Sequence, residues 1–366
     1  HTSTSRCSSA ASDVYKRQPA DIERAADDPF ISGTWADTPC TYGFGFALAS
    51  RGVVALAGDS PARAVLLFQL LGALGLLGCA WLVARTTRLL GTEDDATLVT
   101  LFLWSPWALL HFVSNAHNDM WMGFFVVLAA HALLRERWWL VVPALVAGAL
   151  VKHLALLALP FFLLAIVRNA GWRAAIGSTA LGAVLGVGVA LPYLGDVGAW
   201  KLDEIARILT SPANSLPGAV LYTWSHTLGN EGDFASLAFR MAVGCAFLVF
   251  AVWRFASRVP VRNYDAQEAI EDAATTLFVL LCIASMAWHP WYPGMILGLV
   301  LLLPRERRVR RLLIAVTVFQ LLAFTPLGKA RVLEALVMRA LPMALVLWRD
   351  RQDRAGGADP TGPRVV

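Results

Sequence analysis

The sequence VSNAHNDMWMGFFVVLAAHALL, residues 113–134, places a polar cluster directly before an almost uninterrupted apolar run. Two basic residues, Arg135 and Arg137, follow the run. An apolar segment of this length approaches the ~20 residues that cross a bilayer as a helix. The stretch therefore predicts a membrane helix that begins in a polar cluster and ends at a basic loop.

Similar apolar runs recur along the whole chain. Hydrophobic residues make up 57% of the 366 residues and charged residues only 16%, whereas a soluble domain carries roughly 25% charged residues. The backbone must satisfy its own hydrogen bonds in lipid, and the alternating pattern of a barrel is absent from the sequence. We predict an all-α, polytopic integral membrane protein. About eleven transmembrane helices are expected, near residues 61–84, 96–113, 119–134, 138–151, 153–167, 174–194, 234–253, 273–288, 293–304, 312–327 and 333–348.

Basic residues mark every second connection between these segments. By the positive-inside rule, such loops face the cytoplasm. The net charge of +5 is thus interpreted as a topology signal, with no nucleic-acid partner. The remaining connections are expected on the external, periplasmic face of a bacterial plasma membrane, and with them any function; they are residues 19–60, 114–119, 152–153, 195–233, 289–292 and 325–331.

The two ends of the chain differ from the apolar middle. Residues 1–18, HTSTSRCSSAASDVYKRQ, resemble translated adapter sequence and are interpreted as non-native, so that the true N-terminus with further helices would be missing; a disordered native tail is the alternative. Residues 19–60 are expected to form an external loop with an interfacial helix. Residues 61–350 form the predicted transmembrane domain, and 351–366 a disordered cytoplasmic tail.

The polar cluster at the start of the 119–134 helix has two interpretations. An Asn or Asp at this place normally caps the free N–H groups of the first helical turn, and we expect Asp119 to do so. A cap leaves His117 and Asn118 unexplained. Polar groups at membrane depth are costly and usually functional, so we place both residues, with Asp119, in a binding or catalytic site.

Two further connections that we expect on the external face contain candidate binding residues. Lys152 interrupts an apolar run; it either reaches the interface along its alkyl chain or binds a phosphate. In the turn AWHPWYP, residues 287–293, Trp288, Trp291 and Tyr292 form either an aromatic belt or, with His289, a sugar-binding platform. We place His289, Trp291 and Tyr292 in the candidate binding site.

Other candidates are more isolated. Lys329 and Arg331 lie outside, against the charge trend, which favours an anion contact. Asp37 is a candidate base in the first external loop, although an Asp there is more often a turn acceptor. The spacing of the five cysteines predicts no metal site, and neither a cofactor nor a nucleotide-binding motif is indicated.

Taken in order, several of these motifs resemble bacterial polyprenol-phosphate-mannose-dependent alpha-1,6-mannosyltransferases of the MptB type, in the GT-C superfamily. The matching stretches are residues 28–30, 35–43, 116–119, 150–152 and 288–292. The resemblance implies inverting transfer of mannose from a polyprenyl-phosphate donor to a glycan or glycolipid acceptor outside the membrane.

In the family the base is usually an Asp of the first external loop. That loop begins in or before residues 1–18, so Asp37 and Asp119 are the remaining candidates, and the alternative is that the family's base is missing from this sequence. A lipid transporter or flippase is the alternative function, which predicts inverted repeats and broken helices. A structural subunit of an envelope complex is a third.

Overall fold

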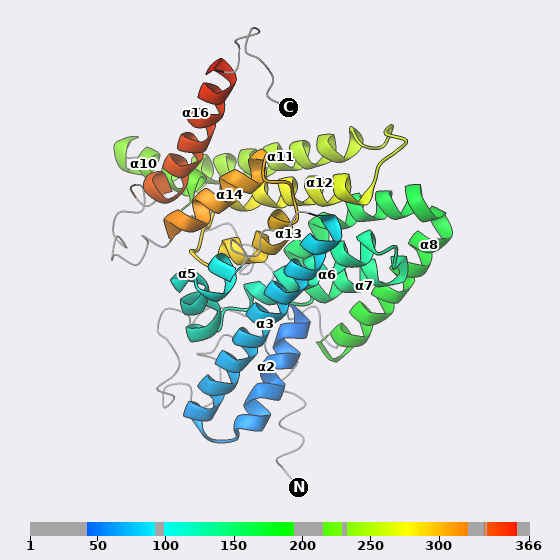
Figure 1. Ribbon diagram of the computed structural model, residues 1–366. Coiled ribbons are helices and arrows are strands. Elements are labelled where there is room, and N and C mark those ends of the chain that lie inside the picture. Colours follow the sequence, from blue (N-terminus) through cyan, green and yellow to red (C-terminus); the bar gives the residue numbers. More distant parts are fainter. Residues whose placement is uncertain are drawn as a thin grey trace.

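The computed structural model describes residues 42–91, 99–193, 215–228, 233–320, 333 and 335–356. Every element in this part of the chain is helical (Figure 1), as predicted. The elements are α2 (Phe44–Ala57), α3 (Pro61–Leu90), η3 (Val99–Leu103), α5 (Pro106–Ala108), η4 (Leu109–Ser114), α6 (Asp119–Leu134), α7 (Trp138–Ala149), η5 (His153–Ala158), α8 (Leu159–Ala190), α10 (Leu216–Leu228), α11 (Asp233–Ala256), α12 (Ala266–Phe278), η7 (Val279–Ala284), η8 (Tyr292–Met295), α13 (Leu297–Leu301), α14 (Arg308–Phe319), η10 (Leu336–Ala340) and α16 (Leu341–Gly356).

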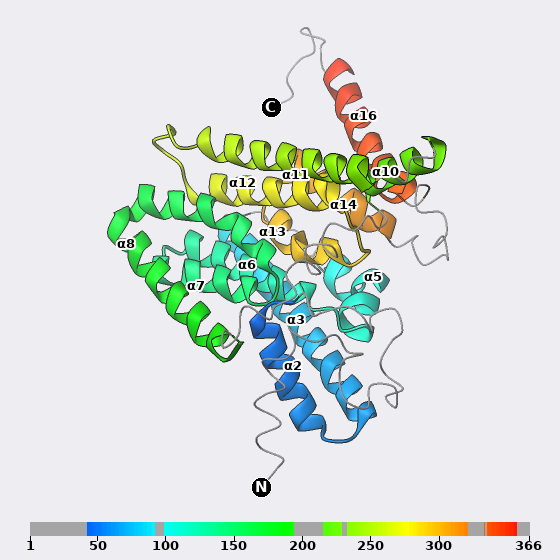
Figure 2. The ribbon, with the colours of Figure 1, turned by 180° about the vertical axis from the view of Figure 1, so that it is seen from behind.

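Helices α3, α6, α7 and α8 pack together around the central part of the core. Small residues allow their close approach: a Cβ at Gly148 of α7 would lie 3.0 Å from the Cβ of Ala155 in η5. Views from opposite sides show α11 and α12 side by side across one end of this group, and α16 projecting beyond it (Figures 1 and 2). The interior is therefore built by helices from both halves of the chain, with α12 and α13 of the second half contributing to the same core.

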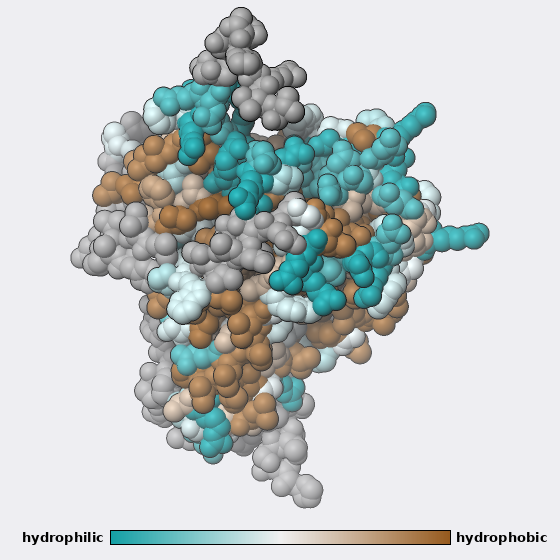
Figure 3. Space-filling view, in the orientation of Figure 1, coloured by the Kyte–Doolittle hydropathy of each residue, from teal (hydrophilic) through white to brown (hydrophobic). Residues whose placement is uncertain are grey.

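The outer surface of several helices is apolar. On α3, the side chains of Leu70, Leu74, Leu77 and Trp81 are all more than half exposed, and hydrophobic side chains cover this part of the molecule in Figure 3. These residues repeat at helical spacing, which gives one continuous stripe. An exposed apolar stripe of this length is the surface expected of a helix that contacts lipid.

Three helical stretches in the described residues are long and apolar enough to cross a membrane: Pro61–Leu90, His153–Tyr193 and Ala235–Ala256. The predicted count of about eleven spans is not confirmed and stays a prediction. Helix α8 has a non-helical residue, Gly171, with φ 83°, which glycine adopts without strain. This break lies between the predicted segments 153–167 and 174–194, beside Arg168 and Arg173.

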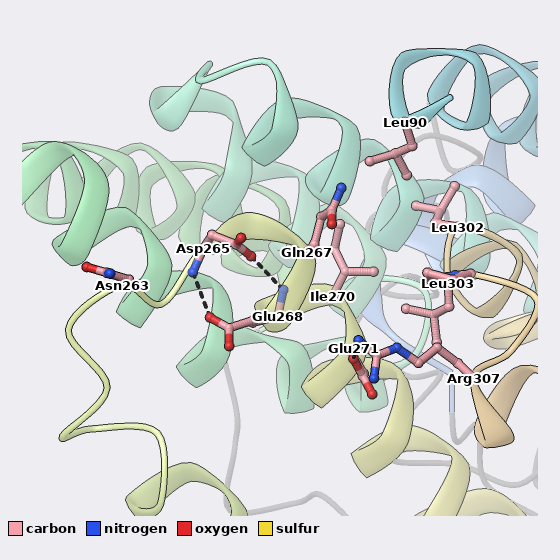
Figure 4. A pocket seen from close by; sticks show the side chains of 11 residues that line it. Leu90, Asn263, Asp265, Gln267, Glu268, Ile270, Glu271, Leu302, Leu303 and Arg307 are labelled. Atoms are coloured by element: carbon pink, nitrogen blue, oxygen red, sulfur yellow. Dashed lines mark hydrogen bonds and ion pairs between the residues drawn. The ribbon is translucent and has the colours of Figure 1, made fainter. Parts of the chain in front are cut away.

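Charged side chains gather where the basic loops meet. The buried carboxylate of Asp272 in α12 accepts from Arg254 at 2.6 Å and from the hydroxyl of Tyr264 at 2.9 Å. A cavity of about 350 Å³ lies nearby; Figure 4 shows the capping pair Asp265 and Glu268 on its wall, with Arg307 opposite. The Asp272 contacts join α11 to α12, so we interpret this end as structural.

Candidate functional site

Asp119 begins α6 without capping it. The N-cap residue is Asn118, and its side chain makes no capping hydrogen bond. The Oδ1 atom of Asp119 instead accepts from the Nζ of Lys152 at 2.7 Å. The prediction that Asp119 caps the helix is therefore wrong: the carboxylate is drawn away from the backbone by a cation 33 residues further along the chain.

Lys152 reaches Asp119 because the chain leaves the helical conformation at this residue. Helix α7 ends at Ala149, and Lys152 is extended, with φ −146° and ψ 125°. The carbonyls of Leu150 and Val151 accept from Phe46 and Gly43 at the start of α2. Two carbonyls left free where α7 ends thus accept hydrogen bonds from backbone N–H groups at the start of α2.

The close contact between α2 and this break also brings an aromatic ring to Lys152. A Cβ at Gly43 would lie only 2.4 Å from the carbonyl oxygen of Leu150, so no side chain fits there. The neighbouring Tyr42 ring lies 5.6 Å from the Nζ of Lys152, and the Tyr292 ring lies 5.4 Å from it. Two rings and one carboxylate therefore surround the ammonium group.

A hydrogen bond from α5 holds the turn before η8, and η8 itself packs against η4. The indole N–H of Trp107 donates to the carbonyl of Pro290 at 2.6 Å. A Cβ at Gly294 would lie 2.3 Å from the Phe112 ring. These contacts place the aromatic turn, residues 289–292, beside the polar loop that precedes α6.

The indole ring of Trp291 lies in a stack with two imidazoles. Its centroid is 3.8 Å from that of His117 and 4.6 Å from that of His289, with interplanar angles of 17° and 8°. Two rings cannot share one indole face at these distances, so the imidazoles cover opposite faces. The predicted role of Trp291 as a sugar-stacking platform does not fit this arrangement, because both faces are occupied.

Burial controls the charge of this cluster. Burial, followed by the charge of Lys152, lowers the pKa of His117 to about 4, and the same two causes lower the pKa of His289 to about 4. Both imidazoles are therefore neutral at pH 7. The second carboxylate oxygen of Asp119 and the amide nitrogen of Asn118 are buried and have no hydrogen-bond partner among the described residues.

The structure brings together seven of the ten residues predicted for the site. Asp37, Lys329 and Arg331 lie outside the described residues. Sequence reasoning missed Trp107 and His111, whose imidazole lies 5.8 Å from the Trp291 ring. Both lie in the apolar region before the polar loop, where the sequence gives no cluster signal. In the described part of the chain, no three His, Cys, Asp or Glu side chains are placed to hold a metal ion.

The fold and this cluster define a helical membrane protein with a buried polar site at helix ends. Residues 2–168 match a family model described as alpha-(1->6)-mannopyranosyltransferase, N-terminal domain, of the MptA_B family. The match confirms the predicted resemblance to MptB-like alpha-1,6-mannosyltransferases.

Two curated relatives carry related names. Alpha-(1->6)-mannopyranosyltransferase A of Mycobacterium tuberculosis (strain ATCC 25618 / H37Rv) is 23% identical over 81% of this chain and 59% of its own length. A probable alpha-(1->6)-mannopyranosyltransferase of Mycolicibacterium smegmatis (strain ATCC 700084 / mc(2)155) is 26% identical over 61% of this chain and 48% of its own. The chain thus spans less than two thirds of these relatives. No solved structure matches it significantly.

Proposed function

We propose that the full-length protein is a membrane glycosyltransferase that moves mannose from a polyprenyl-phosphate donor to a glycan or glycolipid acceptor. The observation that carries the proposal is the buried Asp119–Lys152 pair, set among imidazole and aromatic side chains where α6 begins and α7 ends. The names of the relatives add the sugar and the linkage.

The proposed reaction needs no bound cofactor. A hydroxyl of the acceptor attacks the anomeric carbon of mannose with inversion, and the bond from that carbon to the phosphate oxygen breaks. The electron pair leaves with polyprenyl phosphate, and the hydroxyl proton passes to a carboxylate. Asp119 and Asp37 are the proposed candidates for that carboxylate.

Donor binding is proposed for the residues around this carboxylate. They must hold a phosphate and a sugar while the polyprenyl chain stays in the bilayer. The proposed residues are His117, Asn118, Lys152, His289 and Tyr292 in the described cluster, where Trp291 positions the two imidazoles, with Lys329 and Arg331 in addition.

An external active face is part of the proposal. Helix α6 begins at the site residue Asp119 and ends before the basic pair Arg135 and Arg137. At 1.5 Å per residue, its 16 residues span about 24 Å. The site and the basic loop therefore lie at opposite ends of one apolar helix, which agrees with a cytoplasmic basic side.

The test is a transfer assay with labelled polyprenyl-phosphate-mannose and membranes that contain the full-length protein. We expect label in the acceptor fraction, and its loss in Asp119→Ala and Lys152→Ala. Asp350→Ala removes a carboxylate that contacts Arg308 and Arg311 far along the chain and serves as the control. Absence of transfer by the unaltered protein would overturn the proposal, and movement of the lipid across the membrane without transfer would indicate a flippase.

A further inference from the structure

Two buried polar atoms at the start of α6 are complementary and unsatisfied. Asn118 is 3% exposed and Asp119 is 0% exposed. The Nδ2 of Asn118 needs an acceptor and the Oδ2 of Asp119 needs a donor, and neither has a partner among the described residues. A buried polar group without a partner costs about 1–3 kcal/mol, so these atoms favour a ligand that supplies both.

The chemistry of these two atoms selects the kind of ligand. A hydroxyl group donates one hydrogen bond and accepts others, so sugar hydroxyls satisfy an amide N–H and a carboxylate oxygen together. An ionised phosphate offers only acceptor oxygens. It would satisfy Asn118 but would be repelled by the carboxylate of Asp119.

The charge balance of the described cluster points the same way. The carboxylate of Asp119 is matched by the ammonium of Lys152 at 2.7 Å. The imidazoles of His117 and His289 are neutral at pH 7 because burial lowers the pKa of each to about 4. These four side chains therefore sum to zero charge, and they offer no surplus positive charge to a phosphate group.

We propose that Asn118 and Asp119 form a recognition site for hydroxyls of a sugar ring, and that the phosphate of the lipid donor is bound outside their contact. In this arrangement Lys152 is a positioning residue, which orients Asp119 and balances its charge. The sugar ring belongs either to the donor mannose or to the acceptor glycan. The inference rests on the proposed function and divides the proposed donor site into a sugar part and a phosphate part.

The primary test is Asn118→Ala, because this side chain makes no described hydrogen bond that folding would lose. Binding of polyprenyl-phosphate-mannose and of polyprenyl phosphate is measured on the full-length protein in lipid nanodiscs. Loss of one hydrogen bond is expected to weaken binding of the mannose-bearing lipid about tenfold. Binding of polyprenyl phosphate is expected to stay within about twofold.

The outcomes separate the two sources of the sugar. If donor binding is unchanged but the KM for the acceptor rises about tenfold, the sugar ring is that of the acceptor, and the proposal stands. Equal weakening for both lipids would show a phosphate contact and overturn the proposal. No change for donor or acceptor would also overturn it.

Lys152→Met gives a second measurement on the cation. As a positioning residue, Lys152 is expected to affect binding of the mannose-bearing lipid or the acceptor KM, while the affinity for polyprenyl phosphate stays within about twofold. Weakened binding of both lipids would make Lys152 a phosphate ligand and overturn the inference. Asp350→Asn is the matched control and is expected to change neither lipid. If the unaltered protein neither binds nor uses the mannose-bearing lipid, the proposed function fails instead.

Discussion

At the residue scale, the pair formed by Asp119 and Lys152 combines strong attraction with a high cost of desolvation. The side chains are 1% and 16% exposed. Removal of one member of a buried pair leaves the other charge uncompensated, which is more damaging than removal of both. The pair is thus expected to stabilise the site through coupling rather than through either residue alone.

Lys152→Met is expected to lower the free energy of unfolding by about 3–5 kcal/mol, because the Asp119 carboxylate stays buried without its cation. The double variant Asp119→Asn with Lys152→Met is expected to recover most of this loss. Thermal unfolding of the four proteins in one detergent completes the double-mutant cycle. Additive losses in the double variant would contradict the coupling.

At the element scale, the site depends on the close approach of α3 to η4 and the loop after it. A Cβ at Gly72 would lie 1.9 Å from the carbonyl oxygen of Phe112 and 3.3 Å from the Cα of Ala116. Ala116 has φ 52°, a conformation that costs a non-glycine residue about 1–3 kcal/mol. The packing of α3 therefore supports a strained loop next to His117.

Gly72→Ala is expected to push α3 away from η4 and to destabilise the protein by about 1–3 kcal/mol, the usual cost of overpacking. Gly78→Ala is the control on the same helix, since its Cβ would meet the Phe124 ring at an ordinary 3.4 Å. There the gain in helix propensity, up to about 1 kcal/mol, is expected to dominate. The unfolding temperatures of the two variants measure these changes in stability. Equal effects of Gly72→Ala and Gly78→Ala would contradict the packing argument.

At the scale of the whole molecule, the polar site and a basic loop lie at opposite ends of α6. The loop with Asn115 precedes α6, the turn with Glu136 follows it, and both side chains are exposed. In a membrane these two residues should face opposite sides if α6 crosses the bilayer. The alternation of basic loops predicts that Asn115 lies outside.

Cysteine labelling of intact spheroplasts tests this orientation. In a protein without its native cysteines, Asn115→Cys is expected to react with a membrane-impermeant thiol reagent, whereas Glu136→Cys should react only after permeabilisation. Labelling of both in intact cells would show that α6 does not span the membrane. The reversed pattern would place the site on the cytoplasmic side.

The positions of several helices and helix ends could be predicted from the sequence, because they depend on local patterns of apolar and basic residues. Apolar runs between basic loops predicted the 119–134 helix, the end of α7 near Lys152 and the break in α8 near residue 171. Short-range rules were less successful where a distant residue competes, as at Asp119, which bonds to Lys152 rather than to its own helix. Trp107 and His111 also belong to the cluster, but they were missed because their neighbours in the sequence are apolar.

The sequence by itself determined the class of the protein, because hydropathy and the placement of charge are properties of the chain. It also named most members of the site, since polar residues are costly within apolar segments. Only the tertiary structure decided how they meet: the Asp119–Lys152 contact, the two imidazoles on Trp291 and the unsatisfied atoms of Asn118 and Asp119. The physical reason is that Asp119 meets Lys152 across 33 positions of the chain and His117 meets Trp291 across 174, and only helix packing sets such distances.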